Sequence, residues 1–145
     1  MTVGRICQRE VDLAQATEPV RAAARRMESR NVGSLVVIDE AERPMGILTD
    51  RDLALRIVAG GLDADATVVV QVMTPQPRTV SEDTPIEDAL GLMRSASVRR
   101  LPVVDRKGRL VGVLSLDDIL SLLAEEFEEV GKLLERTSPR ALADI

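Results

Sequence analysis

Two seven-residue segments carry the side chains best suited to chemistry in this chain. Residues 46–52 (GILTDRD) and 112–118 (GVLSLDD) share one pattern: glycine, two apolar residues, a hydroxyl residue, two variable residues and aspartate. A hydroxyl group and backbone amides at a helix N-terminus favour an anion such as phosphate. The aspartate can accept two hydrogen bonds from the vicinal hydroxyls of a ribose. Each segment therefore predicts contacts for a phosphorylated sugar.

The same residues also have a purely structural interpretation. Thr49 and Ser115 can cap helices, and Asp52 and Asp118 can stabilise the first helical turn through the helix dipole. For one isolated motif this interpretation would be preferred. Two copies in register, inside a longer repeat, favour a binding role.

The repeat covers most of the chain. Residues 6–58 align with residues 72–124 without a gap, at an offset of 66 positions. A fixed period indicates two copies of one supersecondary unit. Two copies cannot form a solenoid, but they can pack face to face about a pseudo-twofold axis. That arrangement creates two related clefts, and clefts are where small ligands bind.

Each copy predicts the order strand, helix, strand, strand, helix, a mixed α/β fold of the α+β type. Apolar stripes at helical spacing mark the first helices, and Thr84 with Glu87 predicts a capping box there. Short apolar runs predict the strands, and a second helix begins near Arg51 and near Leu116, the former ending at Gly60-Gly61. The stripes are Val20, Ala23, Ala24, Met27 and Ile86, Ala89, Leu90, Met93; the expected strands are 11–14, 35–38, 45–49, 78–80, 101–104 and 110–115.

The expected boundaries are 6–61 for repeat 1, 62–71 for a linker, 72–124 for repeat 2 and 125–145 for a C-terminal helix and tail. A continuous helix is predicted over about 116–136, and its extension over about 125–136 has no counterpart in repeat 1. Its apolar stripe is Leu120, Leu123, Phe127, Val130 and Leu134. The stripe could cover its own domain or dock on another subunit. Residues 137–145 are expected to fray.

Composition excludes several classes of function. The chain has 145 residues, 45% apolar and 30% charged, a net charge of −5 and one aromatic residue, so nucleic acid is not an expected partner. It has no histidine and one cysteine, Cys7, so the commonest general base and an internal disulfide are absent. We find neither a signal segment nor an apolar run of membrane-spanning length. A soluble, cytoplasmic, non-enzymatic protein with no membrane partner is expected.

Several signatures together resemble a known family. They are 72–75 (VMTP), 84–86 (TPI), 98–105 (VRRLPVVD), 32–39 (VGSLVVID) and the two glycine-to-aspartate motifs. The chain resembles a tandem pair of cystathionine-β-synthase (CBS) domains, the Bateman module, over residues 6–124, and in particular its stand-alone prokaryotic members. The resemblance implies a regulatory protein with no obligatory cofactor. Each cleft of such modules commonly binds an adenosine-containing ligand: AMP, ADP, ATP, S-adenosylmethionine, NAD or a cyclic dinucleotide.

The resemblance implies two unequal clefts. The cleft of the repeat 2 motif would contain Val113, Ser115 and Asp118, with Arg99 and Arg100 on phosphate, and would be completed by Cys7, Asp12 and Val32. The cleft of the repeat 1 motif would contain Ile47, Thr49 and Asp52, completed by Met73, Arg78 and Val98, but Gly33 and Ser34 replace the arginine pair.

Two functional hypotheses follow. In the first, the chain is a homodimer that senses an adenine nucleotide, and the bound ligand shifts the population between two dimer geometries. An unidentified target protein would recognise that shift. In the second, the chain is a protein-interaction module whose clefts are degenerate and empty.

Overall fold

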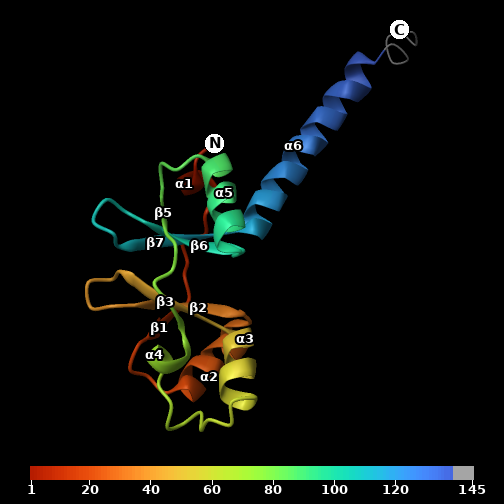
Figure 1. Cartoon of the computed structure of the whole chain (residues 1–145). Coiled ribbons are helices and arrows are strands. Elements are labelled where there is room, and N and C mark those ends of the chain that lie inside the picture. Colours follow the sequence, from red (N-terminus) through yellow and green to blue (C-terminus); the bar gives the residue numbers. More distant parts are fainter. Residues whose placement is uncertain (139–145) are drawn as a thin grey trace.

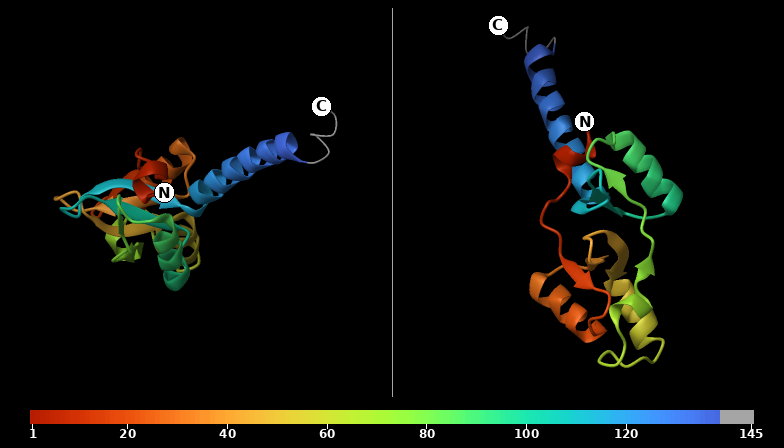
Figure 2. Two further views of the ribbon diagram at one scale, coloured as in Figure 1. Left: turned by 90° about the horizontal axis from the view of Figure 1, so that it is seen from above. Right: turned by 90° about the vertical axis from the view of Figure 1, so that its left-hand side faces the viewer.

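The computed structural model describes residues 1–138 and contains two lobes and one projecting helix. The lobes lie one above the other in Figure 1, and the helix leaves the upper lobe and extends away from both. The right-hand view of Figure 2 shows that two extended segments of the chain run from one lobe to the other.

The first lobe contains a four-stranded sheet in the order β1-β2-β3-β4. Its strands are β1 (Leu13–Gln15), β2 (Ser34–Ile38), β3 (Pro44–Thr49) and β4 (Thr74–Pro75). Its helices are α2 (Val20–Arg30), α3 (Asp50–Asp52), the π-helix η1 (Leu53–Val58) and α4 (Val69–Val72). β1 runs parallel to β2, with α2 as the crossover, and the other pairs are antiparallel.

The second lobe repeats this plan with three strands in the order β5-β6-β7. The strands are β5 (Val80–Ser81), β6 (Arg100–Val104) and β7 (Leu110–Ser115). The helices are α1 (Val3–Ile6), α5 (Ile86–Ala96) and α6 (Leu116–Thr137). The mixed fold of two β-α-β-β-α repeats with a C-terminal helix is therefore confirmed.

One local expectation is wrong. The capping box at Thr84 does not form: Pro85 occupies the N-cap position of α5, and the Thr84 hydroxyl accepts a hydrogen bond from the Ser81 backbone N–H, at 3.2 Å. Thr84 therefore stabilises the turn before the helix. The expected linker, 62–71, carried no predicted helix or strand, but Val69–Val72 form the short helix α4 at its end.

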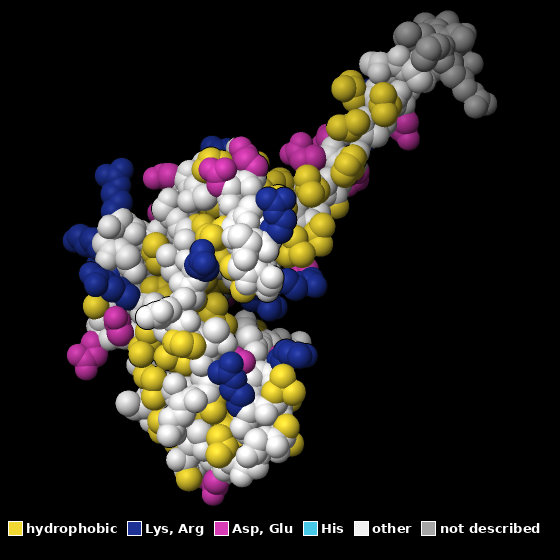
Figure 3. All heavy atoms as spheres, in the orientation of Figure 1, with side chains coloured by type: hydrophobic (Ala, Val, Ile, Leu, Met, Phe, Trp, Pro, Cys, Tyr) yellow, Lys and Arg dark blue, Asp and Glu magenta, His cyan; other side chains and the backbone are white. Residues whose placement is uncertain are grey.

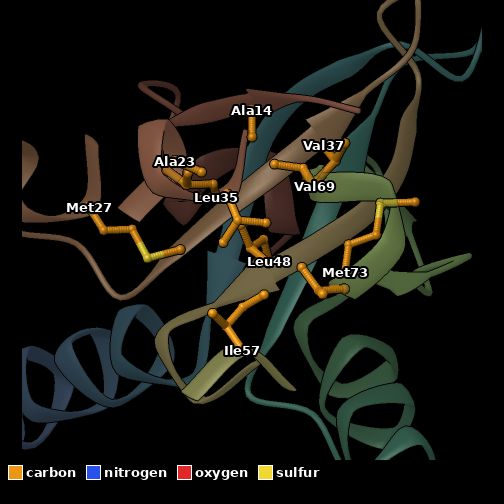
Figure 4. Close-up of a cluster of buried hydrophobic side chains, with 11 residues drawn as sticks. Ala14, Ala23, Met27, Leu35, Val37, Leu48, Ile57, Val69 and Met73 are labelled. Carbon is orange, nitrogen blue, oxygen red and sulfur yellow. The ribbon is translucent and has the colours of Figure 1, made fainter. Parts of the chain in front are cut away.

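Each hydrophobic core includes side chains from the leading segment of the other repeat. Val69, Val72 and Met73, which precede repeat 2 or begin it, pack in the first core against Leu35 and Leu48 (Figure 4). In the same way Val3, at the start of the chain, is fully buried in the second core. The two lobes thus exchange their leading segments reciprocally.

Backbone pairing shows the same exchange. Gln8 forms a bridge with Val113, and 66 residues further on Thr74 pairs with Ile47. Gly112 permits the first contact, because a Cβ there would lie only 2.8 Å from the backbone carbonyl oxygen of Gln8. The motif glycine is thus explained by the close approach of a crossing strand.

The helix α6 is continuous, as predicted, but it does not cover its own domain. Phe127 is 75% exposed and Leu134 is 61% exposed. Figure 3 shows hydrophobic side chains along the helix where it projects from the body of the protein. Docking on another subunit is the alternative that remains. Thr137 is still helical, and residues 139–145 of the expected frayed end lie outside the described residues. Among helices within 1–138, none combines the length and apolarity needed to cross a membrane.

Candidate functional site

A cavity of about 330 Å³ lies between the two lobes. This volume is at the lower end of the range for small-molecule sites. Its wall comes from three parts of the chain: the N-terminal crossing segment, the end of α2 with β2 and β3, and the strands β6 and β7 with the start of α6. The lining residues are Gln8, Glu10, Val11, Asp12, Asn31, Val32, Gly33, Ser34, Val36, Ile47, Arg100, Pro102, Val113, Ser115 and Asp118.

Ser115 and Asp118 hold each other in place at the start of α6. The Ser115 backbone N–H donates to Asp118 Oδ2 at 2.9 Å, and the Asp118 N–H donates to Ser115 Oγ at 3.1 Å. This capping box is the structural interpretation of the motif, and the structure contains it. It also fixes the carboxylate at the cavity wall, so the capping and binding roles are compatible.

The second oxygen of Asp118 faces the N-terminal crossing segment. Gln8 donates a side-chain hydrogen bond to Asp118 Oδ1 at 3.1 Å. Gln8 is itself exposed, so this bond competes with water and is weak. A ligand hydroxyl could replace the Gln8 amide as donor to this oxygen.

Arg100 contributes a positive charge to the cavity wall. It lies directly opposite Ser115 in the antiparallel register of β6 and β7. Its side chain forms neither a hydrogen bond nor an ion pair with any residue of 1–138, so its five donors are available to a ligand. Arg99 does not line the cavity; it is 70% exposed and lies 3.6 Å from Asp117.

Carboxylates outnumber guanidinium groups in the cavity wall. Asp12 is neutralised by Arg30, whose Nε donates to Asp12 Oδ1 at 2.8 Å. Glu10 forms neither a hydrogen bond nor an ion pair within the described chain, although the positive charge of Arg30 also acts on it. The cavity can therefore attract one phosphate group at Arg100, but a long polyphosphate would meet uncompensated negative charge.

Cys7 lies beside the cavity wall and is not part of it. Its Sγ would be 3.0 Å from a Cβ at Gly112, so it packs against the motif glycine. Burial raises the pKa of the Cys7 thiol, so the neutral thiol prevails at physiological pH. A packing role fits this environment better than a nucleophilic one.

Of the residues expected in the cleft of the repeat 1 motif, Ile47 alone lines this cavity. Ile47 lines the cavity between the lobes and faces the repeat 2 motif residues. Thr49 and Asp52 form the same capping box as their counterparts, but Arg56 Nε lies 3.9 Å from Asp52 Oδ1. Met73 is buried in the first core, and Arg78 and Val98 are exposed.

Arg56 is a residue that motif reasoning did not single out. Its Nη1 donates to the carbonyl oxygens of Val72, at 2.7 Å, and Met73, at 3.0 Å. It therefore fixes the end of α4 close to the carboxylate of Asp52. The equivalent position in repeat 2 is Leu122, so this contact exists on one side of the molecule alone.

Eight further wall residues were not predicted as site residues: Gln8, Glu10, Val11, Asn31, Gly33, Ser34, Val36 and Pro102. Gln8 and Glu10 could have been inferred only from the crossing of the N-terminal segment. Asn31 carried a usable signal in the sequence, because an asparagine follows the apolar stripe of the first helix. In the structure it follows α2 in the left-handed conformation, with φ of 53°. Asparagine is enriched at such helix ends.

Comparison with known proteins identifies the repeat unit. A sequence-family model described as the CBS domain matches residues 3–59 and 69–125. An uncharacterised protein of Methanopyrus kandleri is 34% identical over 139 residues, which cover 93% of this chain and 71% of that protein.

Solved structures show the same fold with ligands bound. A CBS domain protein from Pyrobaculum aerophilum complexed with AMP has a TM-score of 0.73 and 31% identity, covering 81% of this chain and 89% of that one. The CBS domain pair of protein MJ0100, in complex with 5′-methylthioadenosine and S-adenosyl-L-methionine, has a TM-score of 0.77 and 25% identity, covering 87% of this chain and 98% of that one. The chain belongs to the CBS domain family, as a tandem pair of CBS domains.

Proposed function

We propose that this protein is a regulatory module that binds an adenosine-containing nucleotide in the cavity between its two lobes. The observation that supports this most directly is the placement of Asp118 and Arg100 on one cavity wall. A carboxylate in the first turn of α6 and a guanidinium at the start of β6 suit a ribose and a phosphate, respectively. The bound AMP and S-adenosylmethionine of the two solved relatives support the same ligand class.

The apolar part of the wall completes the proposal. Val32, Val36 and Ile47 come from the first lobe, and Pro102 and Val113 come from the second. An adenine ring placed between these side chains would contact both lobes. Such a ligand would favour the lobe arrangement that it fits, and an unidentified target protein would bind one arrangement better than the other.

The charge of the wall predicts a preference among nucleotides. One unpaired arginine shares the cavity wall with Glu10 and Asp118, so AMP should bind more tightly than ATP in the absence of a divalent cation. A cytoplasmic location, where adenine nucleotides are present, is part of this proposal.

Calorimetric titration with adenosine and with AMP would test both contacts. Asp118→Asn keeps an acceptor for the Ser115 N–H but removes the charge, and should weaken both ligands by about tenfold. Arg100→Ser, which copies Ser34 of repeat 1, should weaken AMP by about tenfold and leave adenosine unchanged.

Asp88→Asn is the matched control, because Asp88 is also the third residue of its helix and does not line the cavity. It should bind both ligands as the unmodified chain does. No heat of binding with any of AMP, ADP, ATP or S-adenosylmethionine would contradict the proposal and favour the interaction module with empty clefts.

A further inference from the structure

The exposed apolar stripe of α6 is not explained by nucleotide binding. Leu120, Leu123, Phe127, Val130 and Leu134 are between 45% and 75% exposed. No residue beyond Ile119 belongs to either hydrophobic core of the described chain. An apolar helix face of this length in water requires a partner.

The spacing of the stripe indicates what kind of partner it is. Leu120, Leu123, Phe127, Val130 and Leu134 are separated by 3, 4, 3 and 4 residues. This is the mean period of 3.5 residues that keeps a seam aligned between two supercoiled helices. A helix that packs on a globular surface needs no such alternation, so the pattern favours a second helix.

Charges on α6 are arranged so that a second copy can supply that helix. Glu125, Glu128 and Glu129 lie away from the seam, and Lys132 pairs with Glu129 at 3.1 Å and with Glu128 at 3.7 Å in the same helix. Glu126 alone among the glutamates flanks the seam. Most of the negative charge therefore stays on the outer face when two copies pair.

The position of Glu126 also selects an orientation. In a parallel pair, this side chain lies beside the partner's Gly131, and no like charges meet. In an antiparallel pair centred on Phe127, the two copies of Glu126 would lie beside each other and repel. Gly131 also leaves room, because a Cβ there would meet no atom within 4 Å.

We propose that α6 pairs in parallel with α6 of a second copy of this chain, through the seam Leu120–Leu134. With Leu133, six side chains would each lose on the order of 100 Å² of exposed surface per copy. The pair would then remove about 1,200 Å² from water, near the lower limit for a specific interface. The dimer is accordingly expected to dissociate within the micromolar range.

Sedimentation equilibrium of the full chain over a range of concentrations tests the pairing. The mass should rise from 15.8 kDa to twice that value as concentration increases. Val130→Glu places a charge in the seam and should raise the dimer dissociation constant by on the order of 100-fold. Ser121→Glu adds the same charge on the exposed outer face of α6 and should change it little.

A chain that remains monomeric at about 100 μM, or a Val130→Glu variant that dimerises normally, would overturn the proposal. The proposed nucleotide site is independent of this outcome, since its wall ends at Asp118. A monomeric Val130→Glu chain that still binds AMP would support both proposals separately.

Oxidative cross-linking tests the orientation. In a Cys7→Ala background, Leu134→Cys should form a disulfide with its own counterpart, because identical seam positions face each other in a parallel pair. An antiparallel pair would separate these residues by roughly 20 Å. If cross-linking instead requires a mixture of Leu134→Cys and Leu120→Cys chains, the parallel arrangement is wrong.

Discussion

Asp118 and Asp52 show how identical local geometry can serve unequal sites. Each accepts a backbone hydrogen bond at 2.9 Å within a capping box. The two residues are 66 positions apart and occupy the same place in matching motifs. Their second oxygens differ in surroundings: Asp118 meets the exposed amide of Gln8, whereas Asp52 lies near Arg56. The motif predicted the carboxylates, but the groups around them come from distant segments.

Another carboxylate, that of Asp105, makes the stability of the folded state depend on pH. Backbone N–H bonds from Arg109 and Lys107, at 3.0 and 2.8 Å, hold the pKa of Asp105 below its ordinary value of 3.8. A depressed pKa means that the ionised form stabilises the folded state above pH 3.8 and that this contribution disappears as pH falls through the folded-state pKa.

Asp105→Asn should therefore lower the melting temperature at pH 7, and the difference from the unmodified chain should shrink toward zero in strong acid. Thermal unfolding from pH 7 to pH 2 measures this. Glu40→Gln, in the turn between β2 and β3, is the control, because Glu40 accepts no hydrogen bond from residues 1–138. A difference that persists unchanged at low pH would show that the Asp105 charge is not responsible.

At the scale of the elements, the pairing of the N-terminal segment with β7 depends on Gly112. An alanine there would place its Cβ 2.8 Å from the Gln8 carbonyl oxygen and 3.0 Å from Cys7 Sγ. We expect Gly112→Ala to lower the free energy of unfolding by about 1–3 kcal/mol, as overpacking does. Gly91→Ala, in the interior of α5 with no atom within 4 Å, should instead raise it by about 0.5–1 kcal/mol. Urea denaturation of both variants gives the two signs, and equal signs would contradict the packing argument.

The elements themselves were largely predictable, because α2 and α5 bury most of the stripes that their sequences display, although Leu90 of the α5 stripe is 37% exposed. Val20, Ala23 and Met27 are buried in α2 as the spacing requires. The helix α4 and the strand β4 were not predicted, since their structure depends on which lobe they join. An apolar run of six residues is compatible with a strand or a buried helical turn, and tertiary contacts decide between them.

At the scale of the whole molecule, the part of α6 beyond the body should be dispensable for folding. A chain truncated after Ala124 retains every residue of both cores and of the cavity wall. Its melting temperature at low protein concentration and its AMP affinity should match those of the full chain, while its tendency to dimerise should be lost. A large drop in melting temperature would mean that residues 125–138 stabilise the lobes directly.

The arrangement of the site could be predicted only partly at this scale. Matching motifs indicated that two repeats face each other, and six of the eight residues expected with the repeat 2 motif line one cavity. The exceptions, Cys7 and Arg99, lie one position away from Gln8 and Arg100, which do line it. Alignment fixes a residue's place in the repeat, but the direction of its side chain follows from strand register and twist.

The exchange of leading segments has a consequence for the protein during its synthesis. Val3 is translated more than a hundred residues before Leu114 and Ile119, yet it shares a core with them. The first lobe, likewise, cannot complete its core until Val69 and Met73 have been made. The segment around Val3 must therefore stay exposed until the second lobe has been translated, and its long-range contacts are among the last to form.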